Sequence, residues 1–304
     1  MNHDMRDYGG VIISVVICTY NRSALLEGAL RSLVQQTCER DRFEIIVVDN
    51  ASSESTNEIF EKFLSFPNLF YIREEKLGLS YARNRGYRIA KGEYVAYMDD
   101  DARADRGWIR NILAFIRRHP DIVAFGGPYR GYSEVQIPKW FKRSYGSWTL
   151  GDQERPIGSN EWINGTNMIF KRTLLERLGG FDTKVGMSGN RLSYGEETGF
   201  LLKIKANEDP IFYVPDIIVD HFIPEYKLKL KWQFKSNYIN GFSSLETFGF
   251  KKQPVRQCFM TIYACFKGLI RFLFCKEPYF KTRILESFSE FIWHLGLTVR
   301  MCRG

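Results

Sequence analysis

Three consecutive carboxylates, Asp99, Asp100 and Asp101, directly follow the apolar run from Tyr94 to Met98. Adjacent carboxylates at the end of a buried strand repel one another, and this repulsion is costly unless a cation offsets it. Because side chains alternate between the faces of a strand, Asp99 and Asp101 are expected on one side and Asp100 on the other. Such an Asp-x-Asp pair suits a hard divalent cation that also holds phosphates. The alternative from these residues alone is a solvated acidic turn before a helix that starts near Asp105.

The sequence around this triplet alternates between short apolar strands and amphipathic helices. Strands are expected at 11–18, 43–48, 69–72 and 94–98, and helices at 25–33, through Leu64, at 80–90 and at 108–116. This rhythm predicts a parallel sheet with helices on both faces. Ligands of such sheets bind outside the carboxyl ends of the strands, which is where Thr19, Asp49 and Asp99 fall. Three strand ends therefore direct polar groups toward one crevice, and this favours a metal and phosphate site over an acidic turn.

Several short motifs occur in an order that resembles a known family. They are Thr-Tyr-Asn-Arg at 19–22, Val-Asp-Asn-Ala-Ser at 48–52, Ala-Arg-Asn-Arg-Gly at 82–86, the aspartate triplet, Asn164 to Asn167, Gly195 to Glu197, and His221. Together they resemble family 2 glycosyltransferases, which use nucleotide sugars and have the α/β GT-A fold, a Rossmann-like, mostly parallel sheet with helices on both faces. The resemblance covers roughly residues 12–225, and the order of the motifs makes it more specific than any one of them.

The resemblance implies a nucleotide site in the first half of the chain. Asp49 would accept the imino N–H of a pyrimidine base, which suits an ionised carboxylate because it can only accept hydrogen bonds. Arg83 would grip diphosphate oxygens, and Asp99 would face the ribose. The implied nucleotide-binding residues are Thr19, Tyr20, Asn21, Arg22, Asp49, Asn50, Arg83, Asp99 and Asp100. From the residues alone, ordinary turn or helix-cap chemistry also explains Thr19, Asn21 and Asp49, and a solvated helix face also explains Arg83.

The same resemblance assigns Asp101 to a divalent metal that bridges the two phosphates, with Asp99 and His221 as further ligands. Such a metal would offset the negative charge that grows on a departing nucleoside diphosphate. Mn²⁺ or Mg²⁺ is the expected cofactor, because an imidazole beside carboxylates suits manganese better than calcium. A single histidine after the apolar run 217–219 is equally consistent with a hydrogen-bonded core or rim residue.

The catalytic base is expected where the helix at 198–206 opens. Gly195, Glu196 and Glu197 resemble the family's Gly-Glu-Asp segment, whose second acid deprotonates the acceptor hydroxyl. Here that acid is Glu197, which is one methylene longer than Asp, so either the backbone lies further from the acceptor or Glu196 takes the role. Two glutamates in the first turn also stabilise a helix without any catalytic function. By resemblance, the acceptor or donor sugar is faced by the polar turn Asn164, Gly165, Thr166 and Asn167, although a plain turn explains this segment almost as well.

Charge divides the chain unevenly. Residues 226–304 contain 14 Lys and Arg against 4 Asp and Glu, a balance of +10, while the whole chain carries +8. We expect a catalytic domain at 1–225, with nucleotide binding in 11–126 and the acceptor side in 127–225, followed by a basic, amphipathic helical segment at 226–304. Lys267 and Arg271 lie one turn apart among apolar residues, which fits a helix in an anionic headgroup layer. A helical cap that buries this apolar surface fits equally well.

Three features bear on localisation. The longest charge-free stretch of the tail, 257–266, is too short to cross a bilayer. The first ten residues lack the apolar core of a signal peptide, and the six cysteines show no Cys-x-x-Cys spacing. We therefore expect a reduced, cytoplasmic protein, with peripheral attachment to the cytoplasmic face of a membrane as one role of the tail. The segment 129–161 is expected to be an acceptor-facing loop.

The sequence thus predicts a metal-assisted, inverting glycosyltransferase of polysaccharide biosynthesis. It would move a sugar from a UDP- or TDP-type donor to a glycan or lipid-linked acceptor, and inversion rests on the resemblance alone. A sugar-phosphate nucleotidyltransferase is the alternative, but it would need a Gly-rich basic loop after the first strand, and residues 19–22 do not supply one. A basic tail is also found in nucleic-acid-binding proteins. Nucleic acid is not expected as a partner, because these charges lie among large apolar residues.

Overall fold

The computed structural model describes residues 10–53, 56–189 and 191–302. The chain divides into two compact units. The first contains the described residues up to Arg130, together with Trp148–Phe181 and Leu201–His221. The second contains Gly131–Ser147, Asp182–Phe200 and the described chain from Phe222 onward.

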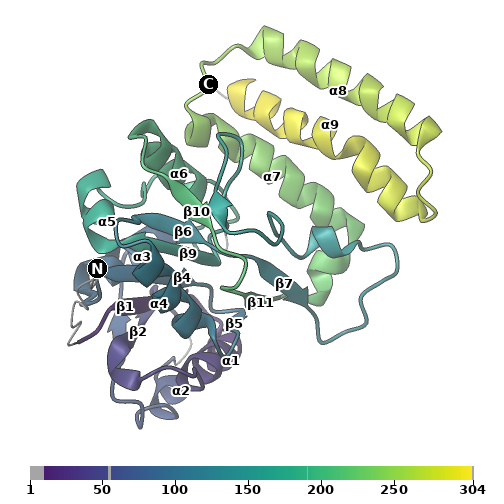
Figure 1. Cartoon of the computed structure of the whole chain (residues 1–304). Coiled ribbons are helices and arrows are strands. Elements are labelled where there is room, and N and C mark those ends of the chain that lie inside the picture. The colour runs from purple at the N-terminus through teal and green to yellow at the C-terminus, as the bar shows by residue number, and fades with distance from the viewer. Residues whose placement is uncertain (1–9, 54–55, 190, 303–304) are drawn as a thin grey trace. The chain divides into compact units, whose positions relative to one another are not determined.

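The first unit is built on an eight-stranded mixed sheet (Figure 1). Its strands lie in the order β3 (Leu69–Arg73), β2 (Phe43–Asp49), β1 (Ile13–Thr19), β4 (Tyr94–Met98), β9 (Asn167–Lys171), β6 (Ala124–Gly126), β10 (Ile211–Tyr213) and β8 (Arg155–Pro156). The first four strands of this order are parallel, as the alternating pattern predicts. Strand β9 runs antiparallel to both of its neighbours, so the sheet is parallel only in part.

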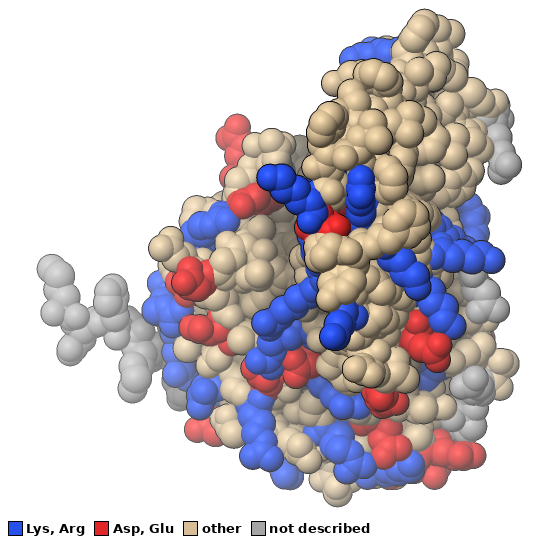
Figure 2. All heavy atoms as spheres, turned by 90° about the vertical axis from the view of Figure 1, so that its right-hand side faces the viewer, with Lys and Arg blue, Asp and Glu red and all other residues tan. Residues whose placement is uncertain are grey.

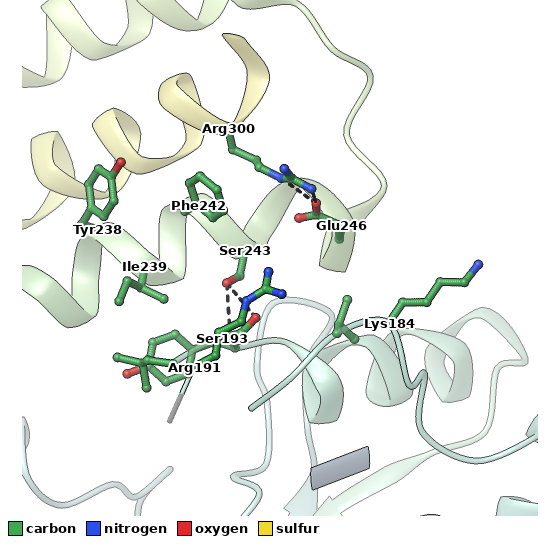
Figure 3. A pocket seen from close by; sticks show the side chains of 12 residues that line it. Lys184, Arg191, Ser193, Tyr238, Ile239, Phe242, Ser243, Glu246 and Arg300 are labelled. Atoms are coloured by element: carbon green, nitrogen blue, oxygen red, sulfur yellow. Dashed lines mark hydrogen bonds and ion pairs between the residues drawn. The ribbon is translucent and has the colours of Figure 1, made fainter. Parts of the chain in front are cut away.

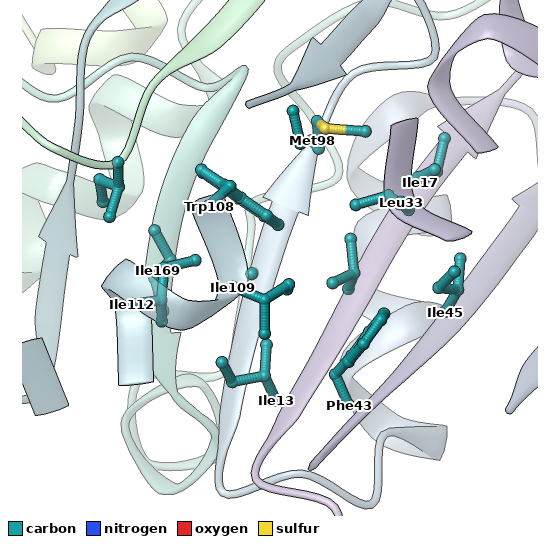
Figure 4. Close-up of a cluster of buried hydrophobic side chains, with 14 of the residues drawn as sticks. Ile13, Ile17, Leu33, Phe43, Ile45, Met98, Trp108, Ile109, Ile112 and Ile169 are labelled. Atoms are coloured by element: carbon teal, nitrogen blue, oxygen red, sulfur yellow. The ribbon is translucent and has the colours of Figure 1, made fainter. Parts of the chain in front are cut away.

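Alternation along β1 divides the packing between the two faces of the sheet. Ile13 and Ile17 belong to the main core with residues of α1 (Ser23–Val34) and α4 (Trp108–Arg118), such as Leu33 and Trp108 (Figure 4). Val16 points to the opposite face, which α3 (Leu79–Ile89) covers. A Cβ at Gly86 would lie 2.4 Å from Cγ1 of Val16, so α3 can lie this close to the sheet only with glycine at that position.

The first unit also holds α2 (Asn57–Glu61), α5 (Arg172–Leu178), the short η1 (Arg40–Arg42) and, from Leu201 onward, α6 (Glu196–Ala206). We expected the helix after the second strand to continue through Leu64, and that prediction was wrong in its end point. The amides of Lys62, Phe63 and Leu64 donate to carbonyls only three residues back, so the chain tightens into turns before Pro67.

A second, three-stranded sheet follows the order β5 (Ala102–Ala104), β11 (Val219–Phe222) and β7 (Tyr129–Tyr132). Strand β5 begins directly after the aspartate triplet. It pairs antiparallel with β11 in a register that sets His221 opposite Ala102. Backbone pairing therefore brings His221 next to Asp101, although the two residues lie far apart in the sequence.

The second unit is mainly helical, which confirms the predicted helical tail. It holds η3 (Glu225–Leu228), α7 (Leu230–Phe248), α8 (Pro254–Phe274) and α9 (Phe280–Cys302), with the short η2 (Arg143–Tyr145) and the first turn of α6 (Glu196–Ala206). Helices α7 and α9 pack backbone against backbone. A Cβ at Gly241 would lie 1.9 Å from the carbonyl oxygen of Trp293, and one at Gly296 would lie 2.0 Å from that of Tyr238.

Helix α8 departs from the expectation for the tail. Its length and composition would allow it to cross a membrane, and only 22% of its apolar 18-residue window is buried. The charge-free stretch 257–266 did not predict a helix of this apolar length, because the apolar residues continue past Lys267 and Arg271.

Candidate active site

The aspartate triplet lies where β4 ends, and its three side chains have different partners. Asp100 is buried, and its Oδ2 accepts a hydrogen bond from Thr19 Oγ1 at 2.8 Å. Nη1 of Arg22 lies 3.2 Å from Oδ1 of Asp100 and 3.3 Å from Oδ2 of Asp101. Burial raises the pKa of Asp100 to about 7, although the charge of Arg22 lowers it in part. Arg22 therefore partly offsets the repulsion between Asp100 and Asp101, a role that the sequence pattern alone did not assign to it.

Asp99 and Asp101 form a cluster with His221. Each residue offers one ligand atom, and these atoms all lie within 4.8 Å of one another. The imidazole Nε2 of His221 is 3.2 Å from Oδ1 of Asp101, and the ring of Tyr129 packs edge-on against His221 at 5.3 Å. Two carboxylates and an imidazole suit an ion such as Mn²⁺.

Arg83 lies beside this cluster, on α3. Its side chain is only 4% exposed, which excludes the solvated helix face as its environment. The guanidinium Nη2 is 3.8 Å from Oδ1 of Asp99, and its Cζ lies 5.4 Å from the ring centroid of Phe181. The arginine is thus held at the carboxylates by a charge on one side and an aromatic ring on the other.

Asp49 ends β2 and is nearly fully buried. Its Oδ2 accepts from Tyr71 at 2.6 Å and from Arg73 at 3.2 Å, and its Oδ1 accepts the backbone amide of Ser52 at 3.0 Å. Burial raises the pKa of Asp49, but the hydrogen bonds from Ser52 and Tyr71 and the charge of Arg73 outweigh it and hold the pKa below its usual value. Sequence reasoning missed Arg73, although strand pairing sets it directly opposite Asp49.

The other residues expected at the nucleotide shape the turns around these strand ends. The side-chain Nδ2 of Asn50 donates to the carbonyl of Lys76 at 2.8 Å, and its Oδ1 accepts from the backbone amide of Gly78 at 2.7 Å. These bonds fix the loop before α3. Asn21 has a positive φ of 50° and accepts from the amide of Ser53 at 2.8 Å. Tyr20 lies half-buried between Thr19 and Asn21.

Asn167 has an interior position. It is fully buried, accepts a hydrogen bond from Trp108 Nε1 at 3.0 Å, and donates to the carbonyls of Pro128 and Ile217 at 3.0 and 2.6 Å. Its amide therefore ties β9 to α4 and to two loops. Gly165 and Thr166 are also buried, while Asn164 is half-buried and accepts from the Thr166 amide at 3.2 Å.

Within the second unit, Glu196 and Glu197 form the first turn of α6. Gly195 precedes them with φ +115°, and a Cβ there would lie 1.8 Å from Thr247 Oγ1, so this position requires glycine. Glu196 is 5% exposed, whereas Glu197 is partly exposed. Glu197 is therefore the carboxylate of the pair that a substrate hydroxyl can reach more easily.

A pocket of about 280 Å³ lies in the same unit (Figure 3). The chain just before Gly195 supplies Arg191, Ser193 and Tyr194 to its wall, and α7 supplies aromatic and hydroxyl groups. Ser243 Oγ lies 3.4 Å from Ser193 Oγ and accepts from the amide of Tyr194 at 3.3 Å. The full lining is Lys184, Val185, Arg191, Leu192, Ser193, Tyr194, Tyr238, Ile239, Phe242, Ser243, Glu246 and Arg300.

The fold class follows from comparison with solved structures. A mannosyltransferase, PcManGT from Pyrobaculum calidifontis in complex with GDP-Man and Mn²⁺, superposes with a TM-score of 0.58 at 22% identity, covering 95% of this chain and 73% of that one. S. aureus TarS 1-349 in complex with UDP-GlcNAc gives a TM-score of 0.59 at 17% identity, covering 92% and 90%. The first unit, with its carboxylates at the ends of parallel strands, therefore has the GT-A glycosyltransferase fold, as predicted.

The particular family follows from the sequence. Residues 14–179 match the model of glycosyl transferase family 2, and the chain belongs to that family and is a glycosyltransferase. It is 28% identical over 239 residues to a glucosyl-dolichyl phosphate glucuronosyltransferase of Haloferax volcanii, covering 76% of this chain and 75% of that protein. It is 27% identical over 241 residues to the succinoglycan biosynthesis protein ExoM of Rhizobium meliloti, covering 75% and 72%. The nucleotidyltransferase alternative is therefore set aside.

Proposed function

We propose that the protein is an inverting glycosyltransferase that moves a sugar from a UDP- or TDP-type donor to a glycan or lipid-linked acceptor. The observation that carries this proposal is the Asp99, Asp101 and His221 cluster at the carboxyl end of β4, in a chain of glycosyl transferase family 2. Two solved structures that resemble this chain are complexes with UDP-GlcNAc and with GDP-Man, which supports a nucleotide-sugar donor. A similar protein of succinoglycan biosynthesis supports a place in polysaccharide biosynthesis.

Asp99, Asp101 and His221 are proposed to hold Mn²⁺ or Mg²⁺. A divalent ion in such a site offsets the negative charge that develops on a leaving diphosphate. Arg83, buried beside Asp99, is proposed to bind phosphate oxygens, since a guanidinium can donate two parallel hydrogen bonds to them. Arg22, which faces Asp100 and Asp101, is a second cation for the same group.

The nucleoside is proposed to lie over the ends of β1 and β2, near Thr19, Tyr20, Asn21 and Asn50, with the ribose toward Asp99. The lowered pKa of Asp49 keeps its carboxylate ionised at neutral pH. An ionised carboxylate is acceptor-only, so it would select a base with an imino N–H, such as uracil or thymine. The hydrogen bonds from Tyr71 and Arg73 would hold Asp49 in a fixed orientation for that contact.

Glu197 is proposed as the general base. Its carboxylate would take the proton of the acceptor hydroxyl while that oxygen attacks the anomeric carbon. The bond from this carbon to the diphosphate oxygen would break as the new bond forms, and its electron pair would leave with the nucleoside diphosphate. Attack from the opposite side inverts the anomeric configuration. The turn at Asn164 to Thr166 is proposed to face the acceptor or the donor sugar.

We further propose that the enzyme works at the cytoplasmic face of a membrane, with the catalytic domain at 1–225 and the basic tail at 226–304 as its attachment. A transfer assay tests the chemistry directly. The purified chain is incubated with Mn²⁺ and a panel of UDP-, TDP- and GDP-sugars, and release of the nucleoside diphosphate is measured. Release from a UDP- or TDP-sugar, abolished by EDTA, is the expected result. Release from GDP-sugars alone would contradict the proposed base recognition.

A further inference from the structure

Helix α8 lies with its apolar side outward. Phe259, Phe266 and Leu273 recur every seven residues, which places them on one helix face, and they are 68%, 62% and 69% exposed. Further exposed apolar residues extend this face along the whole helix, namely Val255, Met260, Ile262, Tyr263, Leu269, Ile270 and Phe274. An exposed apolar surface of this length indicates a site of interaction.

The side of α8 that packs against α9 is small and polar. Oγ1 of Thr261 lies 2.6 Å from Oγ1 of Thr298, and Nε2 of Gln257 lies 2.8 Å from Nδ1 of His294. A Cβ at Gly268 would lie 2.7 Å from the carbonyl oxygen of Ser287, so the two helices approach closely at that point. Small and hydrogen-bonding residues between helices, with apolar residues outside, form the arrangement of helices that pack in lipid. In water the usual arrangement is the reverse.

Charge identifies the surface that fits this helix. Residues 249–276 contain six cations and no Asp or Glu, the cations being Lys251, Lys252, Arg256, Lys267, Arg271 and Lys276. Lys267 is paired with Glu290 at 2.7 Å, and this pair also ties α8 to α9. Figure 2 shows a mostly uncharged expanse in its upper part, with Lys and Arg side chains at its edges. Cations beside an apolar face complement anionic lipid headgroups, whereas a second copy of this face would bring like charges together.

From these observations we propose that the outward face of α8 inserts into the headgroup and acyl boundary of an anionic bilayer, with the helix parallel to the membrane plane. A spanning helix would carry Lys267 and Arg271 into the acyl core at high cost. In the parallel orientation Arg271 can extend to the headgroups, while Lys267 keeps its pair with Glu290. This inference rests on the proposed function for its membrane location, and it identifies the surface that makes the attachment.

Vesicle sedimentation tests this docking surface with a matched pair of variants. Phe266→Ser alters the α8 face, and Leu64→Ser alters a leucine of nearly equal exposure, 61%, in the first unit. The full chain should sediment with phosphatidylglycerol–phosphatidylcholine vesicles and much less with phosphatidylcholine alone. Losing one inserted aromatic side chain should weaken partitioning ~10-fold in Phe266→Ser, while Leu64→Ser should bind like the wild type.

UDP and Mn²⁺ should raise the melting temperature by the same amount in the wild type, Phe266→Ser and Leu64→Ser. This measurement tests the donor site independently of vesicle binding. Three results would overturn the docking proposal. The first is no sedimentation of the wild type with anionic vesicles at low salt. The second is sedimentation that Phe266→Ser leaves unchanged or that Leu64→Ser lowers equally. The third is a dimer in analytical ultracentrifugation that Phe266→Ser dissociates, without any vesicle binding.

Discussion

The imidazole Nε2 of His221 lies 3.2 Å from Oδ1 of Asp101. Pairing of β11 with β5 produces this contact, because it sets His221 opposite Ala102, the residue that follows Asp101. A histidine after an apolar run is thereby brought to the strand-end carboxylates by backbone hydrogen bonds. Strand register therefore places the backbone of His221 beside the triplet.

The two acidic residues at the start of α6 should differ in their effect on catalysis. Removing a general base typically slows turnover by ~10²–10⁴-fold while donor binding changes little. Glu197→Gln should therefore bind donor normally and turn over very slowly, while Glu196→Gln should be milder. Steady-state kinetics with the identified donor, together with calorimetric donor affinity, measure both effects. Greater damage in Glu196→Gln would assign the base to Glu196 instead.

The proposed recognition of the base by Asp49 predicts a change in nucleotide preference. An asparagine at this position can donate a hydrogen bond, and N3 of cytosine can accept one. Asp49→Asn should therefore weaken UDP binding and strengthen CDP binding relative to UDP binding. We expect the ratio of UDP to CDP affinity to fall ~10-fold or more, as for the loss of a charge-assisted hydrogen bond. Calorimetry on both ligands gives the ratio. A uniform loss of both affinities would indicate that Asp49 only supports the turn through Ser52 and Tyr71.

Close packing of α3 on the sheet predicts a stability effect at Gly86. A methyl group there would meet Val16, and overpacking of this kind costs ~1–3 kcal/mol. Gly199 is a matched helical control, since among the described residues none comes within 4 Å of a Cβ at that position. Urea unfolding should show Gly86→Ala to be less stable than the wild type and Gly199→Ala equally or more stable. Equal stability of Gly86→Ala and the wild type would contradict the packing.

Periodicity was enough to predict the parallel half of the sheet, because a sequence displays local alternation directly. The aspartate triplet itself lies in a turn after β4, in which the amide of Ala102 donates to the carbonyl of Asp99 at 3.1 Å, so strand alternation does not determine where its side chains point. The direction of β9 was not predictable, because the apolar run Met168 to Phe170 looks the same in parallel and antiparallel strands. The interior role of Asn167 likewise depends on Trp108, Pro128 and Ile217, which only the folded chain brings together.

The tail shows a second limit of local patterns. Its charge and apolar content predicted a basic amphipathic helix, but they did not reveal which side of α8 would be covered. The helix packs through Gln257, Thr261 and Gly268 because α9 presents hydroxyl and backbone groups to it, including those of Thr298 and Ser287. The orientation of a helix thus depends on its neighbour as well as on its own sequence.

Isothermal titration of UDP with and without Mn²⁺ tests the central claim most directly, namely that Asp101 belongs to a metal and diphosphate site. Wild-type protein should bind UDP more tightly with Mn²⁺, and EDTA should abolish the gain. Asp101→Ala and the near-isosteric Asp101→Asn should stay folded and lose most of this metal-dependent gain, while Asp121→Ala, which removes an exposed carboxylate, should keep it. Undiminished metal-dependent affinity in both Asp101 variants would contradict the account.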